Sequence, residues 1–249
     1  MNRGAVLHLD GRARPWRSLA TMARCGQTLL AESRRPPPRP SVGRHRERAE
    51  LLQRLAASIC DQHRVIVRVH GEPPRRPSIL VANHLSYLDP VVLLSLAPAL
   101  PIAKAELAEW PILGRWIEAT GALFVDRGRV ASGVRILRGA LEILRSGGSI
   151  LNFPEGTTTA GDRILPFRRG IFGLARLAGV DVVPVKITYD SPELAWVGDD
   201  AFLPHYLRVA GRSLSTAFVA FRPPIAADRG DADALARLAR AALLSPRSP

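Results

Sequence analysis

Cysteine and lysine are scarce in this chain of 249 residues, which has two of each: Cys25, Cys60, Lys104 and Lys186. The two cysteines are far apart and lack the spacing of a metal site. We therefore expect no disulfide framework and no metal constellation, and a reducing compartment is the default.

The chain also lacks a long apolar run. The best candidate, residues 91–103, is interrupted by Pro98 and Pro101, and it is shorter than the roughly 20 residues that span a bilayer. The N-terminus has no continuous apolar stretch of the kind found in signal peptides. If the protein meets a membrane, we expect it to lie on the surface rather than to cross it.

Acidic residues are few relative to basic ones, 22 against 35, and the formal net charge is +13. Residues 1–48 hold eleven arginines and three acidic residues, so this segment alone carries +8. The excess reflects either a coding bias toward arginine or an anchoring arm. It favours an anionic partner but does not choose among nucleic acid, anionic lipid and acidic substrates.

The N-terminal part differs in composition from the rest. Apolar positions fit weakly with an amphipathic helix over residues 15–31, although a disordered leader fits almost as well, and residues 33–46 form a stiff linker rich in proline and arginine. We therefore divide the chain into a basic, Pro-rich leader and linker, 1–46, and a folded domain, 47–245. Apolar residues make up 47% of the whole chain, which gives ample material for a core.

From residue 47 onward, helical and strand patterns alternate, which predicts an α/β fold. We expect a mixed, mainly parallel central sheet flanked by helices on both faces and preceded by an amphipathic helix, with the chemistry in loops at strand ends. The predicted helices are 47–61, 86–96, 111–119, 132–145, 170–178 and 231–244, and the predicted strands are 65–69, 78–82, 101–104, 122–125, 149–153, 181–189 and 216–221.

The first polar loop, residues 83–89, follows an apolar strand and contains His84 and Asp89. Imidazole is the natural proton acceptor near neutral pH, and a carboxylate on its other nitrogen would fix the tautomer. The same residues allow a second interpretation, because Ser86 and Asp89 have the spacing of a helix capping box. The loop alone leaves both interpretations open.

Two further loops also follow apolar strands. Residues 121–127 end in an aspartate followed by Arg127, whose guanidinium is suited to a phosphate or to a surface ion pair. Residues 153–159 read Phe-Pro-Glu-Gly-Thr-Thr-Thr, and Gly156 permits a tight turn with exposed N–H groups that suit an anion. Taken alone, residues 121–127 are better explained by a surface ion pair after a buried strand, and residues 153–159 are also consistent with a simple polar turn.

The ordered combination of Asn-His-x4-Asp, Phe-x-Asp-Arg and Phe-Pro-Glu-Gly-Thr resembles the glycerolipid acyltransferase family, which includes the 1-acylglycerol-3-phosphate acyltransferases. The apolar strand 182–185, with its central proline, and Lys104 with the following Pro111 and Gly114 are also similar to the family pattern. The resemblance covers roughly residues 65–222.

The resemblance implies transfer of a fatty acyl group from acyl-CoA or acyl-carrier protein to a lyso-lipid hydroxyl, without a resident cofactor. His84 would be the base in a direct attack on the thioester, and Asp89 would orient it. The acceptor implied first is 1-acylglycerol-3-phosphate, and the alternative is lyso-ornithine lipid or another lysophospholipid.

By the same resemblance, the substrate-binding residues are Asn83, Arg127, Glu155, Gly156, Thr157 and Thr158. The chain departs from the family at Thr158, where many phosphatidate-forming members have an arginine linked to the acceptor phosphate. Arg163, Arg168 or Arg169 is positioned in the sequence to replace it, or the acceptor has a different head group.

The expected location is the cytoplasmic face of the cell membrane, with peripheral or monotopic attachment to an anionic surface. Two other classes remain as alternatives: a basic nucleic-acid-binding protein and a lipid-binding protein without catalysis. The sequence has no zinc-finger spacing, no aromatic RNA-binding motif and no sustained basic helix. We therefore expect no nucleic acid partner.

Overall fold

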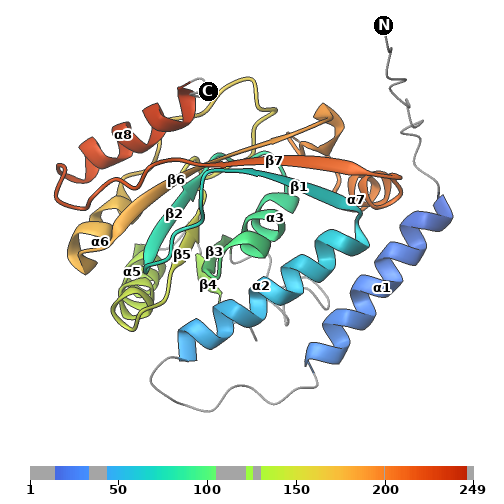
Figure 1. Ribbon diagram of the computed structural model, residues 1–249, viewed down its shortest axis with the longest axis horizontal. Helices are drawn as coiled ribbons and strands as arrows, with labels where there is room; N and C mark the ends of the chain where they lie inside the picture. Colours follow the sequence, from blue (N-terminus) through green and yellow to red (C-terminus); the bar gives the residue numbers. More distant parts are fainter. Residues whose placement is uncertain (1–14, 34–43, 105–121, 126–129, 199, 246–249) are drawn as a thin grey trace, which may run out of the picture.

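The computed structural model describes residues 15–33, 44–104, 122–125, 130–198 and 200–245. Among these residues, a seven-stranded sheet of order β1-β7-β6-β2-β5-β3-β4 forms the centre (Figure 1). The strands are β1 Val65–His70, β2 Ser78–Ala82, β3 Leu100–Lys104, β4 Leu123–Val125, β5 Ile150–Asn152, β6 Asp181–Tyr189 and β7 Ser215–Phe221.

Five neighbouring strands, from β6 through β2, β5 and β3 to β4, run parallel to one another. Strands β1 and β7 are parallel to each other, but β7 is antiparallel to β6. The mixed, mainly parallel sheet is therefore confirmed.

Helices cover both faces of the sheet (Figure 1). Helix α3 and the C-terminal half of α2 pack on one face, and α5, α6 and α8 pack on the other, where Ala49 and Leu52 of α2 also reach the core. The helices are α1 Pro15–Ser33, α2 Arg44–Gln62, α3 Leu88–Leu96, α5 Val130–Arg145, α6 Gly170–Ala178, α7 Phe202–Ala210 and α8 Ala232–Leu244, with a 3₁₀ turn, η2, at Pro192–Leu194.

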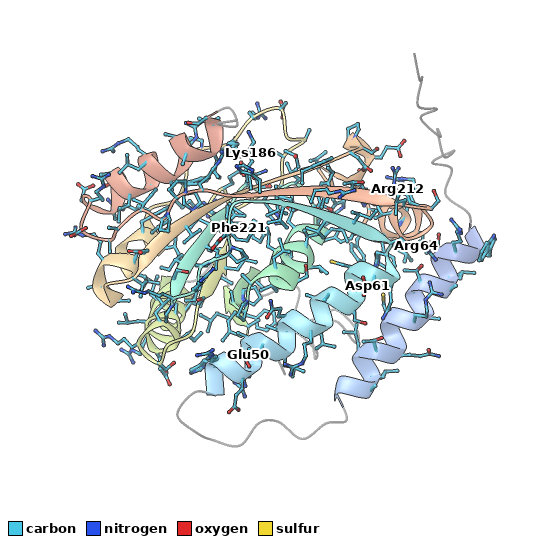
Figure 2. The ribbon with its side chains drawn as sticks, in the orientation of Figure 1. Glu50, Asp61, Arg64, Lys186, Arg212 and Phe221 are labelled. Carbon is cyan, nitrogen blue, oxygen red and sulfur yellow. The ribbon has the colours of Figure 1, made fainter. Side chains whose placement is uncertain are left out.

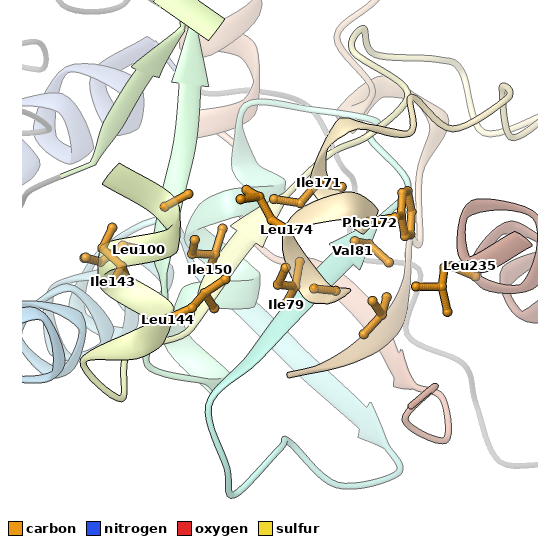
Figure 3. Packing of buried hydrophobic residues seen from close by; sticks show 14 of the residues in the cluster. Ile79, Val81, Leu100, Ile143, Leu144, Ile150, Ile171, Phe172, Leu174 and Leu235 are labelled. Atoms are coloured by element: carbon orange, nitrogen blue, oxygen red, sulfur yellow. The ribbon is translucent and has the colours of Figure 1, made fainter. Parts of the chain in front are cut away.

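Strand β2 shows why the core has two layers. Its side chains alternate: Ile79 and Val81 join the cluster under α5, α6 and α8, shown in Figure 3, whereas Leu80 and Ala82 join the cluster under α2 and α3. A central parallel strand is buried on both faces, so it is apolar at nearly every position. This burial places the end of β2, and the loop that follows it, between fixed neighbours.

Several boundaries differ from the prediction. Helix α2 begins at Arg44, so residues 44–46 of the expected linker are helical, and α3 begins at Leu88, two residues later than expected. Helix α7 and the turn η2 were not predicted. In α7, Pro204 is the third residue, in the first turn, where a missing N–H costs no intrahelical bond. The predicted helix 111–119 lies outside the described residues.

The expected N-terminal amphipathic helix is present as α1, which packs against α7 and α2. It does so through a narrow buried row of three small side chains and one leucine, Ser18, Thr21, Cys25 and Leu29. The Ser18 hydroxyl donates to a backbone carbonyl of α7, at Leu207. The leader is therefore docked on the domain from residue 15 to residue 33.

Candidate active site

Three of the loops or strand ends that carry polar residues meet at one edge of the sheet. Strands β5, β2 and β6 are adjacent and parallel, so their carboxyl ends lie side by side. Residues 83–89 follow β2, residues 153–159 follow β5, and Tyr189 ends β6. In open α/β sheets this edge is where ligands bind.

His84 and Asp89 are in direct contact. His84 Nδ1 lies 2.8 Å from Asp89 Oδ2, and the His84 side chain is 22% exposed whereas that of Asp89 is fully buried. A neutral imidazole that donates from Nδ1 keeps its lone pair on Nε2. The geometry therefore holds the ring in the tautomer that a general base needs. The catalytic role of the pair stays a prediction.

Asp89 is satisfied by four donors, which compensates for burying a carboxylate. Besides the imidazole, Oδ2 accepts the N–H groups of Leu85 and Ser86 at 2.6 and 2.9 Å. Oδ1 accepts the hydroxyl of Tyr189 at 2.7 Å. Burial and the Asp89 charge raise the pKa of Tyr189 well above its usual value, so the phenol remains a donor. Sequence reasoning missed Tyr189, because only the pairing of β6 with β2 brings it near.

Only one of the two hydrogen bonds of a capping box is formed between Ser86 and Asp89. Asp89 accepts the Ser86 N–H, as the acidic member of the box does. The Ser86 hydroxyl, however, is buried without a hydrogen-bond partner among the described residues, and α3 begins without a side-chain cap. Asp89 thus supports the start of α3 and the imidazole at the same time.

The loop after β5 fixes the backbone and the ring of His84. Glu155 accepts the His84 N–H through Oε1 at 2.9 Å and the Leu165 N–H through Oε2 at 2.8 Å. Burial raises the pKa of Glu155, and these two N–H bonds partly oppose the increase. The ring of Phe153 stacks on the imidazole with centroids 4.1 Å apart. These contacts suit a positioning role for Glu155; its predicted contact with the acceptor stays a prediction.

Asn83 joins the same loop to β6. Its Nδ2 donates to the carbonyl of Ile187 at 2.9 Å, and its Oδ1 accepts the Ile187 N–H at 2.9 Å. The side chain is buried. The amide therefore extends the ladder between β2 and β6 by one pair, immediately before His84, and substrate binding by Asn83 stays a prediction.

The turn at Gly156 lies against Arg168. Gly156 has φ +80°, and a Cβ there would lie 3.0 Å from Nε and Cζ of Arg168. Only glycine combines that backbone conformation with so close a guanidinium. Of the three arginines considered as a replacement for an arginine at Thr158, Arg168 has its guanidinium beside the turn. Arg169 pairs with Asp233 at 3.7 Å, and Arg163 contacts the loop through its backbone carbonyl, which accepts the Thr159 hydroxyl.

The other predicted site residues are placed less completely. Thr157 is exposed and Thr158 is half-buried, both on the turn that contains Gly156. Arg127 lies outside the described residues. Within the described part of the chain, His, Cys, Asp and Glu side chains form no group of three or more suited to a metal ion.

Comparison with known proteins agrees with this fold and identifies the family. A family model described as Acyltransferase matches residues 66–188. The chain belongs to this acyltransferase family and is an acyltransferase, since it also shares 37% identity with a curated member over 78% of both chains. That relative is the lyso-ornithine lipid O-acyltransferase of Pseudomonas aeruginosa.

Two further relatives are informative. The 1-acyl-sn-glycerol-3-phosphate acyltransferase of Neisseria meningitidis is 34% identical over 122 residues, which is 48% of each chain. The crystal structure of the 1-acyl-sn-glycerophosphate (LPA) acyltransferase PlsC from Thermotoga maritima matches the fold with a TM-score of 0.68 at 21% identity, covering 92% of this chain and 91% of that one.

Proposed function

We propose that this protein transfers a fatty acyl group from a thioester donor to the hydroxyl of a lyso-lipid, with His84 as the general base. The bond between His84 Nδ1 and Asp89 carries the proposal, because it leaves Nε2 as the acceptor nitrogen at the ligand-binding edge of the sheet. The lipid oxygen attacks the thioester carbonyl as Nε2 takes its proton. The C–S bond then breaks, and the same proton leaves with the thiol.

The surrounding residues hold the base without touching the reacting atoms. Asp89 fixes the tautomer and stabilises the imidazolium that forms during attack. Glu155 and Asn83 anchor the backbone on either side of the ring, through His84 N–H and through Ile187. In this scheme the donor is acyl-CoA or acyl-carrier protein, and no resident cofactor takes part.

We further propose lyso-ornithine lipid as the acceptor. The Pseudomonas relative with that activity matches more of this chain than the Neisseria phosphatidate-forming relative does, 78% against 48%. The chemistry agrees: an ornithine head group carries one carboxylate, and a single guanidinium pairs well with it. Arg168 supplies that guanidinium beside Gly156, whereas Thr158 gives no second cation for a phosphate. 1-Acylglycerol-3-phosphate remains the second candidate, which the Neisseria relative favours.

Acceptor choice is testable by kinetics. With lyso-ornithine lipid and lysophosphatidic acid supplied together, we expect mostly diacyl ornithine lipid by mass spectrometry. Arg168→Gln should raise the acceptor KM roughly 10-fold or more with little change in kcat, because one charge-assisted bond is lost. Arg169→Gln, which removes the neighbouring arginine paired with Asp233, should change KM less than about twofold. Faster acylation of lysophosphatidic acid would reject the ornithine assignment.

Helix α1 supports attachment to a membrane surface. Its apolar side chains Trp16, Leu19, Met22 and Leu30 point away from the domain, and Trp16 and Leu19 are 61% and 58% exposed. Arg17 lies at the edge of this apolar stripe, with its guanidinium over the Trp16 ring. Such a helix suits the boundary between acyl chains and anionic head groups.

The attachment we propose is peripheral or monotopic, at the cytoplasmic face of the cell membrane. None of the helices in the described ranges is both long and apolar enough to cross a bilayer. Anionic lipid of the cytoplasmic leaflet would attract the arginines of residues 1–48, each with about 1 kcal/mol near the surface.

A charge placed in the apolar stripe should release the protein from vesicles. We expect Leu19→Glu to weaken binding to anionic liposomes roughly 10- to 100-fold, because it removes an apolar side chain that would insert into lipid and adds charge repulsion. Ala31→Glu adds the same charge at an exposed position off the stripe and serves as the matched control. Co-sedimentation measures both; equal binding by the two variants would contradict insertion of α1.

A further inference from the structure

A basic hollow lies over β1, β7 and β6, near the β1 edge of the sheet, on the face opposite α2 and α3. Side chains of β1, β7 and β6 line it, with a volume of about 340 Å³. Val185 and Ile187 point into the core under α2 and α3, so Lys186 between them points to the other face, as Figure 2 shows. The lining residues are Arg68, Val69, His70, Lys186, Thr188, Phe218, Val219, Ala220 and Arg222.

Strand register arranges these side chains in two rows. Phe218 pairs with Arg68 on one side and with Thr188 on the other. Ala220 pairs with His70 on one side and with Lys186 on the other. The small Ala220 side chain therefore makes the floor of the hollow, and nitrogen-bearing side chains stand on both sides of it.

The charged side chains that line the hollow are all of one sign. Three of its lining residues, Arg68, Lys186 and Arg222, are basic, none is acidic, and His70 adds ring nitrogens. Like charges on neighbouring strands repel one another, so their arrangement around one concavity favours an anion between them. Arg222 is held in place by a hydrogen bond from Nη2 to the Ser245 carbonyl at the end of α8.

An aromatic ring among cations is the pattern that suits a phosphorylated nucleotide. The half-buried Phe218 offers a ring for stacking a base, and arginine and lysine bind phosphate oxygens. We propose that this hollow binds the adenosine 3′,5′-bisphosphate portion of an acyl-CoA donor. The inference rests on the proposed acyl transfer and selects coenzyme A over a carrier protein. A hollow of 340 Å³ fits a small molecule, whereas a protein surface would need a broader contact.

The hollow lies within reach of His84. Val185 pairs with Ala82, and Ile187 is bound by Asn83, so Lys186 is adjacent to both contacts. Its backbone is on the order of 10 Å from that of His84, given strand spacing and rise. An extended phosphopantetheine arm spans roughly 15–20 Å, about five extended residues, which is enough to bring a thioester from the hollow to the imidazole.

The position of α1 agrees with this assignment. Helix α1 lies beside α2, on the side of the sheet away from the hollow (Figure 1). With the apolar stripe of α1 on lipid, the basic hollow faces water. A charged nucleotide thus approaches from solution and the lipid acceptor from the bilayer.

Binding of adenosine 3′,5′-bisphosphate to the full chain tests the site by calorimetry. We expect the wild type to bind the nucleotide. Arg68→Gln should weaken its affinity roughly 10-fold or more, and adding Lys186→Gln to that variant should weaken it by a similar factor again. Arg54→Gln, an exposed arginine on α2 across the sheet, should leave the affinity unchanged. No wild-type binding, or equal weakening by Arg54→Gln, would overturn the site. If acylation from an acyl-carrier-protein donor requires Arg68 and the chain does not bind the nucleotide, the nucleotide site is overturned in favour of a protein partner.

Kinetics separate the nucleotide site from the reaction itself. Arg68→Gln should raise the KM for acyl-CoA roughly 10-fold at similar kcat and leave turnover of the acyl-pantetheine thioester, which lacks the nucleotide, unchanged. Equal losses on both donors would overturn the nucleotide assignment. If the wild type acylates no lyso-lipid with either donor, the proposed function fails, and the calorimetric result still decides whether the hollow binds nucleotide.

Discussion

Replacing His84 by alanine should lower kcat for acyl transfer by roughly 10²- to 10⁴-fold, the contribution of a well-positioned general base. The reason is specific to this ring. Nδ1 is occupied by Asp89, so in the proposed mechanism Nε2 is the nitrogen left to take the proton of the attacking hydroxyl. Initial rates of thiol release, measured with saturating acceptor, report kcat directly.

The fold should survive this substitution. The His84 side chain is partly exposed, and its main packing partner is the ring of Phe153. The Glu155 contact uses the backbone N–H of residue 84, which alanine retains. Thermal unfolding followed by circular dichroism should therefore remain cooperative. His45→Ala, which removes an imidazole near Glu142, provides the control and should leave kcat unchanged. Turnover by His84→Ala above a tenth of wild type would reject the proposed base.

The contact between His84 and Asp89 was predictable because it is local. His84 and Asp89 are five residues apart, and a loop followed by one helical turn brings their side chains together without help from distant elements. The strand before the loop was equally clear, since β2 is apolar at four of its five positions. Local spacing and local periodicity were thus enough to predict that His84 and Asp89 pair at the end of a strand.

The supporting contacts were not predictable in the same way. Tyr189 is 100 residues from Asp89 in the chain, and Asn83 is 104 residues from Ile187. Both contacts depend on the pairing of β6 with β2, which no local pattern encodes. The direction of β1 and β7, which is opposite to that of the other five strands, also follows from tertiary pairing. The sequence offered three arginines of equal standing, and only the fold shows that the guanidinium of Arg168 lies beside Gly156.

Replacing Asp89 by asparagine should lower kcat by roughly 10²- to 10⁴-fold, as expected when an orienting carboxylate is lost. Asparagine keeps the size of the side chain but replaces one acceptor oxygen with an amide donor. Three protein donors besides the imidazole converge on this carboxylate, from Leu85, Ser86 and Tyr189. If the amide nitrogen faces His84, it favours the imidazole tautomer with the proton on Nε2, which cannot act as a base.

Ser86→Ala distinguishes catalysis from helix capping. The Ser86 hydroxyl has no hydrogen-bond partner among the described residues, so its loss should change stability by less than about 1 kcal/mol and leave kcat within about twofold. Tyr189→Phe removes one donor to Oδ1 and keeps the ring, and it should lower kcat less than Asp89→Asn does. Rates per folded protein, with unfolding measured alongside, give the ranking. A large kcat loss in Ser86→Ala with near-normal turnover in Asp89→Asn would make Asp89 a helix cap and leave His84 without its orienting carboxylate.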